Sequence, residues 1–205
     1  MTQTGLHYGS DASSRSTVIG VPSLILLNGP PSSGKSTLGR RWILGHPLAL
    51  NLDIDVVRGL LGEWAETPHE SGVAACRLAI AMASTHLADG HDVIVPQFLA
   101  REQFIVELDA TARATSARFI EIALIVSRAD TLRAFSSRSA APENQQHRDA
   151  RALLERSGGL DALGEMHDTF TKLLETRPNA HRIDVVRGDV ESTLALVESV
   201  IENSA

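Results

Sequence analysis

The feature that most constrains the fold of this chain is the segment Gly29-Pro30-Pro31-Ser32-Ser33-Gly34-Lys35-Ser36. It has the spacing G-x-x-x-x-G-K-[ST] of a phosphate-binding loop, here called the P-loop. An apolar run at residues 24–27 is typical of a buried strand, and residues 36–42 can form a helix directly after the loop. This order aims backbone N–H groups and the positive end of a helix dipole at bound phosphate. The sequence therefore predicts a nucleotide phosphate site.

Each position of the P-loop has an expected role in binding ATP. Lys35 is expected to reach the β- and γ-phosphates, and Ser36 is expected to offer its hydroxyl to Mg²⁺. Lys35 is one of only two lysines among 19 Lys and Arg residues, so its place in the motif is poorly explained by a bare turn. The predicted nucleotide ligands are Gly29, Pro30, Pro31, Ser32, Ser33, Gly34, Lys35, Ser36 and Thr37.

The composition is that of an ordinary globular protein, with 43% hydrophobic and 21% charged residues in 205. No apolar run approaches the ~18 to 20 residues of a membrane span. Residues 1–20 are expected to be a disordered tail and residues 21–205 one domain. Cys76 is the only cysteine, so no internal disulfide can form and a cytoplasmic location is expected. A net charge of −6 argues against nucleic acid as a partner, and the oligomeric state stays open.

Strand-like and helix-like segments alternate along the chain. The expected strands lie at residues 24–27, 48–52, 93–95, 119–126 and 181–186. The expected helices lie at residues 36–42, 56–64, 71–88, 101–114, 160–176 and 190–201. This alternation predicts an α/β fold in which helices cover both faces of a parallel sheet.

Three elements of the sequence carry a resemblance to a known group of enzymes. They are the motif at residues 29–37, the segment Asp53-Ile-Asp55-Val-Val-Arg58, and the arginine-rich region that follows the fourth expected strand. Residues 22–202 resemble the small P-loop kinases with the adenylate and shikimate kinase fold. Within that group they are similar to the branch that contains polynucleotide 5′-kinases, zeta-toxin-like sugar-nucleotide kinases and chloramphenicol phosphotransferase.

The resemblance implies both a fold and a reaction. The fold is a three-layer α/β/α P-loop NTPase with a five-stranded parallel sheet in the order 2-3-1-4-5 and a helical lid at about residues 128–159. The reaction is transfer of the γ-phosphoryl group of ATP to a hydroxyl. The resemblance also places Arg187, after the fifth strand, near the adenine. The fold does not determine the acceptor.

Two carboxylates are expected at the edge of the sheet where ligands of open α/β proteins collect. In the Asp-x-x-Arg pattern of the related polynucleotide kinases the Asp is the general base and the Arg contacts substrate, which corresponds here to Asp55 and Arg58. Asp55 could alternatively cap a helix that begins at Val56. Asp53 could orient a Mg²⁺-bound water, bind substrate, or simply end the strand.

Arginines from the lid are expected to neutralise the charge that develops during phosphoryl transfer. The candidates are Arg133 and Arg138. At 100° per residue they lie about 140° apart, so both could reach one phosphate chain only if the helix bent near residues 136–137. Possible substitutes are Arg128, Arg148 and Arg151.

The third expected strand departs from many P-loop proteins because no acid follows it. Gln97 and Phe98 stand there instead. Gln97 can hydrogen-bond a substrate or a Mg²⁺-bound water but carries no charge. The metal would therefore depend on Ser36, the phosphates and waters, with Asp53 as a further candidate. Phe98 could stack on an acceptor ring or belong to the core.

Three functions are compatible with these features. The leading hypothesis is an ATP-dependent kinase that phosphorylates a hydroxyl of a small molecule such as an antibiotic, nucleoside or sugar derivative. The second is a polynucleotide 5′-hydroxyl kinase, suggested by Asp55-x-x-Arg58 and opposed by the acidic net charge. The third is a nucleotide-dependent ATPase or switch that acts on a protein partner.

Overall fold

The computed structural model describes residues 20–142 and 144–204, so residues 1–19 of the expected tail lie outside the described part. Five parallel strands form one sheet in the order β2-β3-β1-β4-β5, which confirms the expected order. The strands are β1 (Ser23–Asn28), β2 (Leu50–Asn51), β3 (Val93–Gln97), β4 (Arg118–Ile125) and β5 (His181–Asp184). Strand β1 is buried along its whole length, which explains the four apolar residues at 24–27 in its centre.

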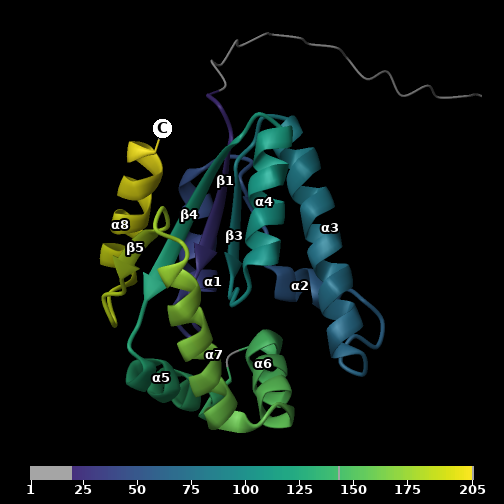
Figure 1. Cartoon of the computed structure of the whole chain (residues 1–205), viewed down its shortest axis with the longest axis vertical. Coiled ribbons are helices and arrows are strands. Elements are labelled where there is room, and N and C mark those ends of the chain that lie inside the picture. Colours follow the sequence, from purple (N-terminus) through teal and green to yellow (C-terminus); the bar gives the residue numbers. More distant parts are fainter. Residues whose placement is uncertain (1–19, 143, 205) are drawn as a thin grey trace, which may run out of the picture.

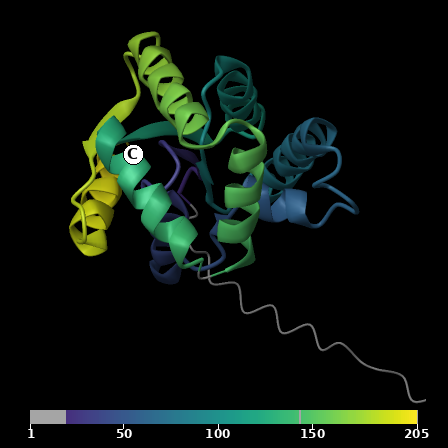
Figure 2. The ribbon, with the colours of Figure 1, turned by 90° about the horizontal axis from the view of Figure 1, so that it is seen from below.

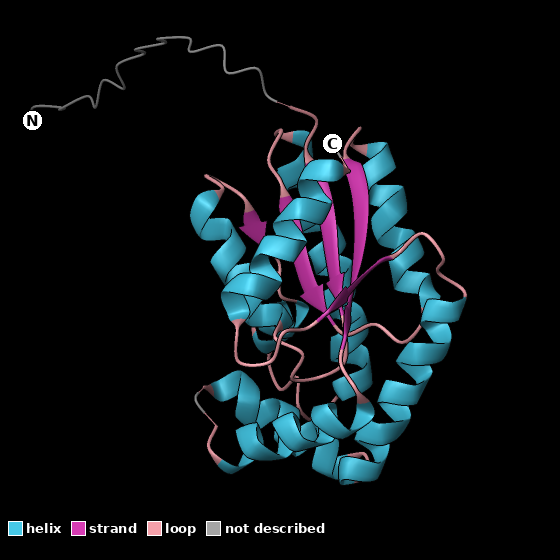
Figure 3. Ribbon diagram, turned by 90° about the vertical axis from the view of Figure 1, so that its left-hand side faces the viewer, coloured by secondary structure: helices cyan, strands magenta, loops and turns pink. Residues whose placement is uncertain are grey.

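Helices cover both faces of the sheet, as Figures 1 and 3 show. Side chains alternate along β1: Leu24 and Leu26 pack toward α3 (Pro68–Ala88) and α4 (Glu102–Ala114), in a core that also includes residues of α2 (Ile54–Gly59). Ile25 and Leu27 pack on the opposite face. That face is covered by α1 (Lys35–Trp42) and α8 (Val190–Asn203).

A group of three helices lies beyond the carboxyl ends of the strands. It consists of α5 (Arg128–Ala140), α6 (Gln145–Arg156) and the first half of α7 (Gly159–Glu175), here called the lid. Figure 2 looks onto this end of the molecule. Phe135, Leu154 and Leu163 give the lid a small core of its own. The second half of α7 returns to the sheet, where Phe170 and Leu174 pack against Ala123.

The chain between the first and third strands differs most from expectation. Strand β2 spans only Leu50–Asn51, and the helix expected at residues 56–64 is α2 (Ile54–Gly59). It begins two residues early because Asp53, rather than Asp55, accepts the capping hydrogen bond. A short 3₁₀ helix, η1 (Ile43–Gly45), follows α1. Within the described part, no helix combines the length and apolar character needed to cross a bilayer.

Candidate functional site

The P-loop turns sharply between β1 and α1. Ser32 and Gly34 both have positive φ values, 64° and 93°, and the N–H of Ser33 donates to the carbonyl of Pro30 at 3.2 Å. Gly29 is needed for a different reason: a Cβ at this position would lie 3.0 Å from Cβ and 3.2 Å from the carbonyl oxygen of Leu124. The loop is therefore held tightly against β4, with its helix starting at Lys35.

Lys35 lies buried within the loop that it completes. Its Nζ donates to the carbonyls of Gly29 and Pro30, both at 2.8 Å, and lies 3.4 Å from Oγ of Ser33. The pKa of Lys35 is lowered to about 7, chiefly by burial; the charge of Asp55 opposes the change, Arg138 adds to it, and Asp53 opposes it. A phosphate anion would restore the charged form.

Asp53 joins the start of α2 to the P-loop. One carboxylate oxygen accepts from the backbone N–H of Asp55 at 3.0 Å, and the other accepts from Oγ of Ser36 at 3.1 Å. Asp53 is 8% exposed, so this carboxylate is buried beside the P-loop hydroxyl. The helix cap considered for Asp55 is thus supplied by Asp53, and Asp55 is free of that role.

Asp55 and Arg58 form an ion pair on α2. Nη2 of Arg58 donates to Oδ1 of Asp55 at 2.7 Å, and the guanidinium lies 5.1 Å from the ring centre of Trp64. Removal of solvent by the surrounding walls raises the pKa of Asp55, and Arg58 partly offsets that rise. The Asp55 side chain is still 52% exposed, so water limits the size of the effect.

These groups surround one cavity of about 370 Å³. Its floor is the P-loop and α1 with Asp53, Asp55 and Arg58, its side is the end of β3, and its roof is the lid. The end of β3 contributes Gln97 and Phe98, two of the predicted acceptor residues. The ring of Phe98 also meets Phe170 at 6.3 Å between centres, so Phe98 belongs to the core and lines the cavity.

The two candidate lid arginines lie in different places. Helix α5 continues without a break from Arg128 to Ala140, so they point to different sides. Arg138 lines the cavity with its guanidinium 5.2 Å from the ring centre of Phe135, and burial lowers its pKa. Arg133 does not line the cavity and pairs with Asp130.

The remaining basic candidates also have partners outside the cavity. Arg187 pairs with Asp130, so it lies next to the start of the lid. The three substitute candidates of the lid pair locally: Arg128 with Asp168, Arg148 with Gln145, and Arg151 with Glu155 and the carbonyl of Ser139.

Two parts of the site were not predicted from the sequence. Asn28 is fully buried at the end of β1, where its side chain accepts from the N–H groups of Gly29 and Leu99 and donates to the carbonyl of Leu99. It therefore ties the P-loop to the loop after β3. The sequence contained a signal for this role, because Asn28 is a polar residue that ends an apolar strand directly before the P-loop motif. The second part is the side of α6 that faces the cavity. It depends on how the lid docks over the sheet, which the local sequence does not indicate.

The donor set suits a magnesium ion held mainly by its substrate. Among residues 20–142 and 144–204, no cluster of three or more His, Cys, Asp or Glu side chains could hold a metal. Ser36 and Asp53 nevertheless present a hydroxyl and a carboxylate at one point of the P-loop. Mg²⁺ favours such oxygen ligands and usually retains several waters and phosphate oxygens.

Comparisons with known proteins agree with this geometry. The model of the AAA_33 family, described as an AAA domain, matches residues 24–162. No curated protein sequence matches the chain significantly. Among solved structures, a proposed kinase from Chloroflexus aurantiacus is similar over 90% of this chain and 98% of its own, with 17% identity and a TM-score of 0.61.

Two further structures share the fold. The Deinococcus radiodurans tunicamycin resistance protein is similar over 88% of this chain and 96% of its own, with 12% identity and a TM-score of 0.53. A chain of the Pnkp1/Rnl/Hen1 RNA repair complex has 16% identity and a TM-score of 0.54, over 76% of this chain and 46% of its own. The family match includes the P-loop, α2 and most of the lid, and the chain therefore belongs to the AAA_33 family, with the fold of a small P-loop kinase.

Proposed function

We propose that this protein is an ATP-dependent phosphotransferase that moves the γ-phosphoryl group to a hydroxyl of a small molecule, such as an antibiotic, nucleoside or sugar derivative. The observation that carries the proposal is that Lys35, Asp55 and Arg138 all line the same roofed cavity. A phosphate-binding cation, a carboxylate and a lid arginine are the groups that phosphoryl transfer requires around the reacting atoms. The cytoplasm, which supplies ATP, is the proposed location.

Each group has a role in the proposed reaction. The acceptor oxygen bonds to the γ-phosphorus as the bond from that phosphorus to ADP breaks, and the hydroxyl proton passes to Asp55. The raised pKa of Asp55 makes it a stronger base than an ordinary aspartate. Lys35 and Arg138 stabilise the negative charge on the phosphoryl oxygens. Arg58 positions Asp55 through Oδ1 and leaves the other carboxylate oxygen for the acceptor.

Magnesium would be held at the junction of Ser36 and Asp53. The Ser36 hydroxyl would bind the ion directly, and Asp53 would bind it or one of its waters. The ion supplies charge neutralisation and alignment of the phosphates. Asp53 takes the place of the missing acid after β3, because β2 ends beside β3 and brings this carboxylate to the P-loop.

The test is a mass-spectrometric screen of acceptor pools with ATP and Mg²⁺. Wild-type protein is expected to give a product heavier by one phosphoryl group, and the product is expected to disappear in Lys35→Ala and Asp55→Ala. Asp109→Ala, which changes a carboxylate on α4 that pairs with Arg113, serves as the control and should keep full activity. ATP hydrolysis without any product, unaffected by Asp55→Ala, would instead support an ATPase or switch.

A polynucleotide 5′-hydroxyl kinase is the second candidate. The Asp55-x-x-Arg58 pair and the fold shared with a chain of an RNA repair complex favour it. The net charge of −6 opposes it, because proteins that grip nucleic acid usually carry excess positive charge. Labelling of 5′-hydroxyl oligonucleotides at low salt would establish this candidate, and absence of labelling would exclude it.

A further inference from the structure

The roof of the cavity is largely apolar, apart from Arg138 of α5 and His147 of α6, whereas its floor carries Lys35, Asp53, Asp55 and Arg58. On α6, the residues that line the cavity are His147, Ala150, Leu153 and Leu154, and Ser157 follows at the end of the helix. Leu163 and Met166 of α7 continue this surface. The other sides of α6 are mostly charged or exposed, so the apolar residues gather where the helix faces the cavity.

Part of this surface is explained by packing within the lid, and part is not. Leu154 and Leu163 form the lid core with Phe135, and Met166 packs against it. Leu153 is different. It lines the cavity, is partly exposed, and belongs to none of the hydrophobic clusters found among the described residues. An unclustered leucine that faces a cavity provides apolar area to a ligand rather than to the fold.

The position of the cavity indicates which ligand meets this surface. Its lining comes from the P-loop and α1, from residues 53–58, from the end of β3 and from the lid. Neither β4, β5 nor the loop that follows β5 contributes to it. The sheet order places those elements on the other side of β1. The cavity therefore lies on the half of the site that contains Asp55, where the acceptor must bind, and not on the half expected for adenine.

The polar groups of this half stand opposite the apolar roof. Asp55 and Arg58 lie on α2, and Gln97 ends β3. Oε1 of Gln97 is buried and accepts no hydrogen bond from any described residue. A buried acceptor of this kind is stabilised when a ligand N–H or O–H reaches it. The cavity thus has one polar wall beside the reacting atoms and, above them, a wall that is mostly apolar except for Arg138 and His147.

We infer that the acceptor is an amphipathic alcohol, with an apolar ring or chain packed under Leu153 and Met166 and with its reactive hydroxyl directed to Asp55. A second donor on the acceptor would hydrogen-bond to Gln97. This inference rests on the proposed function and narrows its substrate class. Free sugars have no apolar portion to cover Leu153 and Met166, and polynucleotides would place phosphates against these two side chains, so both fit the cavity poorly.

The experiment measures kcat/KM for a series of alcohols that runs from free hexoses to aryl-substituted diols. The apolar area of the acceptor increases along the series, while each member offers a hydroxyl that can be phosphorylated. In wild-type protein kcat/KM is expected to increase with apolar area. Leu153→Asn is expected to raise the KM of the most apolar acceptor about tenfold and to leave that of the hexoses and of ATP unchanged. Leu160→Asn, at an exposed leucine of the lid outside this cavity, is the matched control.

The outcomes separate the two proposals. The amphipathic acceptor would be overturned if kcat/KM for hexoses equalled or exceeded that for the aryl alcohols. It would also be overturned if Leu153→Asn changed the KM of both classes equally. Either result would leave the kinase proposal standing. No phosphorylated product from any alcohol would overturn the proposed function itself. Unfolding temperatures of Leu153→Asn and Leu160→Asn close to that of the wild type would exclude misfolding as the cause of a change in KM. If the polar substitution unfolds the lid, Leu153→Ala provides a second variant.

Discussion

At the scale of single residues, burial changes the protonation of Lys35, the side chain proposed to bind the phosphates. The pKa of Lys35 is lowered to about 7 in the folded protein, whereas an unperturbed lysine has a value of 10.5. Between these values the unfolded chain binds more protons than the folded protein. The contribution of this group to stability therefore rises with pH from about 7 to 10.5, because the charged form is disfavoured in its buried position. Bound phosphate reverses that preference.

Proton uptake on nucleotide binding is the measurable consequence. At pH 8 Lys35 is mostly neutral without ligand and becomes charged beside the phosphates, so binding of ATP is expected to take up close to one proton. Calorimetry in buffers of different ionisation enthalpy measures this number. Lys35→Arg keeps a permanent charge and should bind without the uptake. Wild-type binding with no proton uptake at pH 8 would contradict the lowered pKa.

Most of the residues predicted from the sequence line one cavity, but the sequence did not indicate which of the candidate arginines would join them. The motif and the strand ends determine the positions of the residues that do line the cavity. These include Lys35, Asp53, Asp55, Arg58, Gln97 and Phe98. Arg133 and Arg138 lie on one helix with similar surroundings in sequence. Only the docking of α5 directs Arg138 inward and leaves Arg133 to Asp130. A choice of this kind depends on tertiary contacts that a local pattern does not contain.

At the scale of elements, the strands were predictable and the ends of α2 were not. Long apolar runs determined β1, β3 and β4 to within a few residues. Asp53 and Asp55 are equally good capping residues, and the choice of Asp53 depends on its contact with Ser36, which is distant in sequence. The second strand is short because only Leu50 and Asn51 pair with β3.

The packing of α1 on the sheet gives a stability prediction. A Cβ at Gly39 would lie 2.6 Å from Oδ1 of Asn51 and 3.3 Å from Cγ of Pro96. Gly39→Ala is therefore expected to destabilise the fold by about 1–2 kcal/mol, since α1 must move away from the sheet. Gly59→Ala, on α2 with no atom within 4 Å, is the control and should be neutral or slightly stabilising. Urea denaturation measures both, and equal effects would contradict the close approach.

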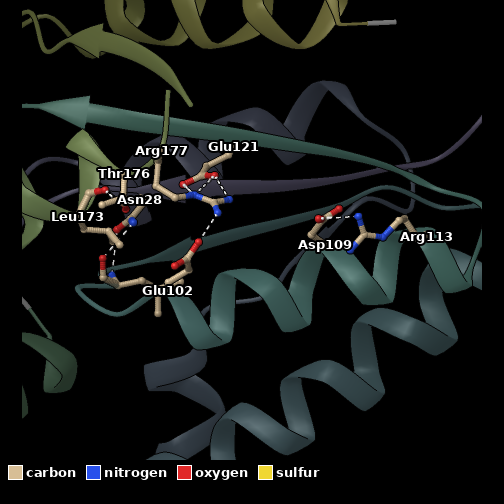
Figure 4. Close-up of polar contacts among 9 residues, drawn as sticks. Asn28, Glu102, Asp109, Arg113, Glu121, Leu173, Thr176 and Arg177 are labelled. Atoms are coloured by element: carbon tan, nitrogen blue, oxygen red, sulfur yellow. Dashed lines mark hydrogen bonds and ion pairs between the residues drawn. The ribbon is translucent and has the colours of Figure 1, made fainter. Parts of the chain in front are cut away.

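Two arginines in Figure 4 allow buried and exposed ion pairs to be compared. Arg177, after α7, donates to Glu121 of β4 at 2.6 Å and to Glu102 of α4 at 3.0 Å. Glu121 is 7% exposed, and its hydrogen bond raises the pKa of Arg177. Arg113 pairs with Asp109 on the surface of α4 at 3.0 Å.

Arg177→Leu is expected to cost about 3 kcal/mol of unfolding free energy, because it leaves Glu121 buried without its partner. Arg113→Leu should cost less than about 0.5 kcal/mol. Chemical denaturation measures both differences, and an Arg177→Leu variant as stable as the wild type would show that Glu121 finds another partner.

At the scale of the whole molecule, the lid reaches across the acceptor side of the site. Nη1 of Arg156, the last residue of α6, donates to the carbonyl of Ala65 in the loop between α2 and α3 at 2.8 Å. Ser71 holds that loop by donating to the carbonyl of Trp64 at 2.9 Å. The contact joins the roof of the cavity to the segment that carries Arg58 and Trp64, so it closes the acceptor side rather than the nucleotide side.

Arg156→Ala is therefore expected to weaken binding of the acceptor and not binding of ATP. Loss of one hydrogen bond from a charged donor should raise the KM of the acceptor about fivefold and leave the KM of ATP unchanged. Amide exchange in α6 should become faster in the same variant, because the helix loses its contact with the opposite wall. Arg148→Ala removes an exposed arginine of α6 whose side chain, among the described residues, hydrogen-bonds to Gln145 of the same helix, and it should change neither quantity. A rise in the KM of ATP, or the same exchange rates in both variants, would show that this contact does not hold the lid over the acceptor.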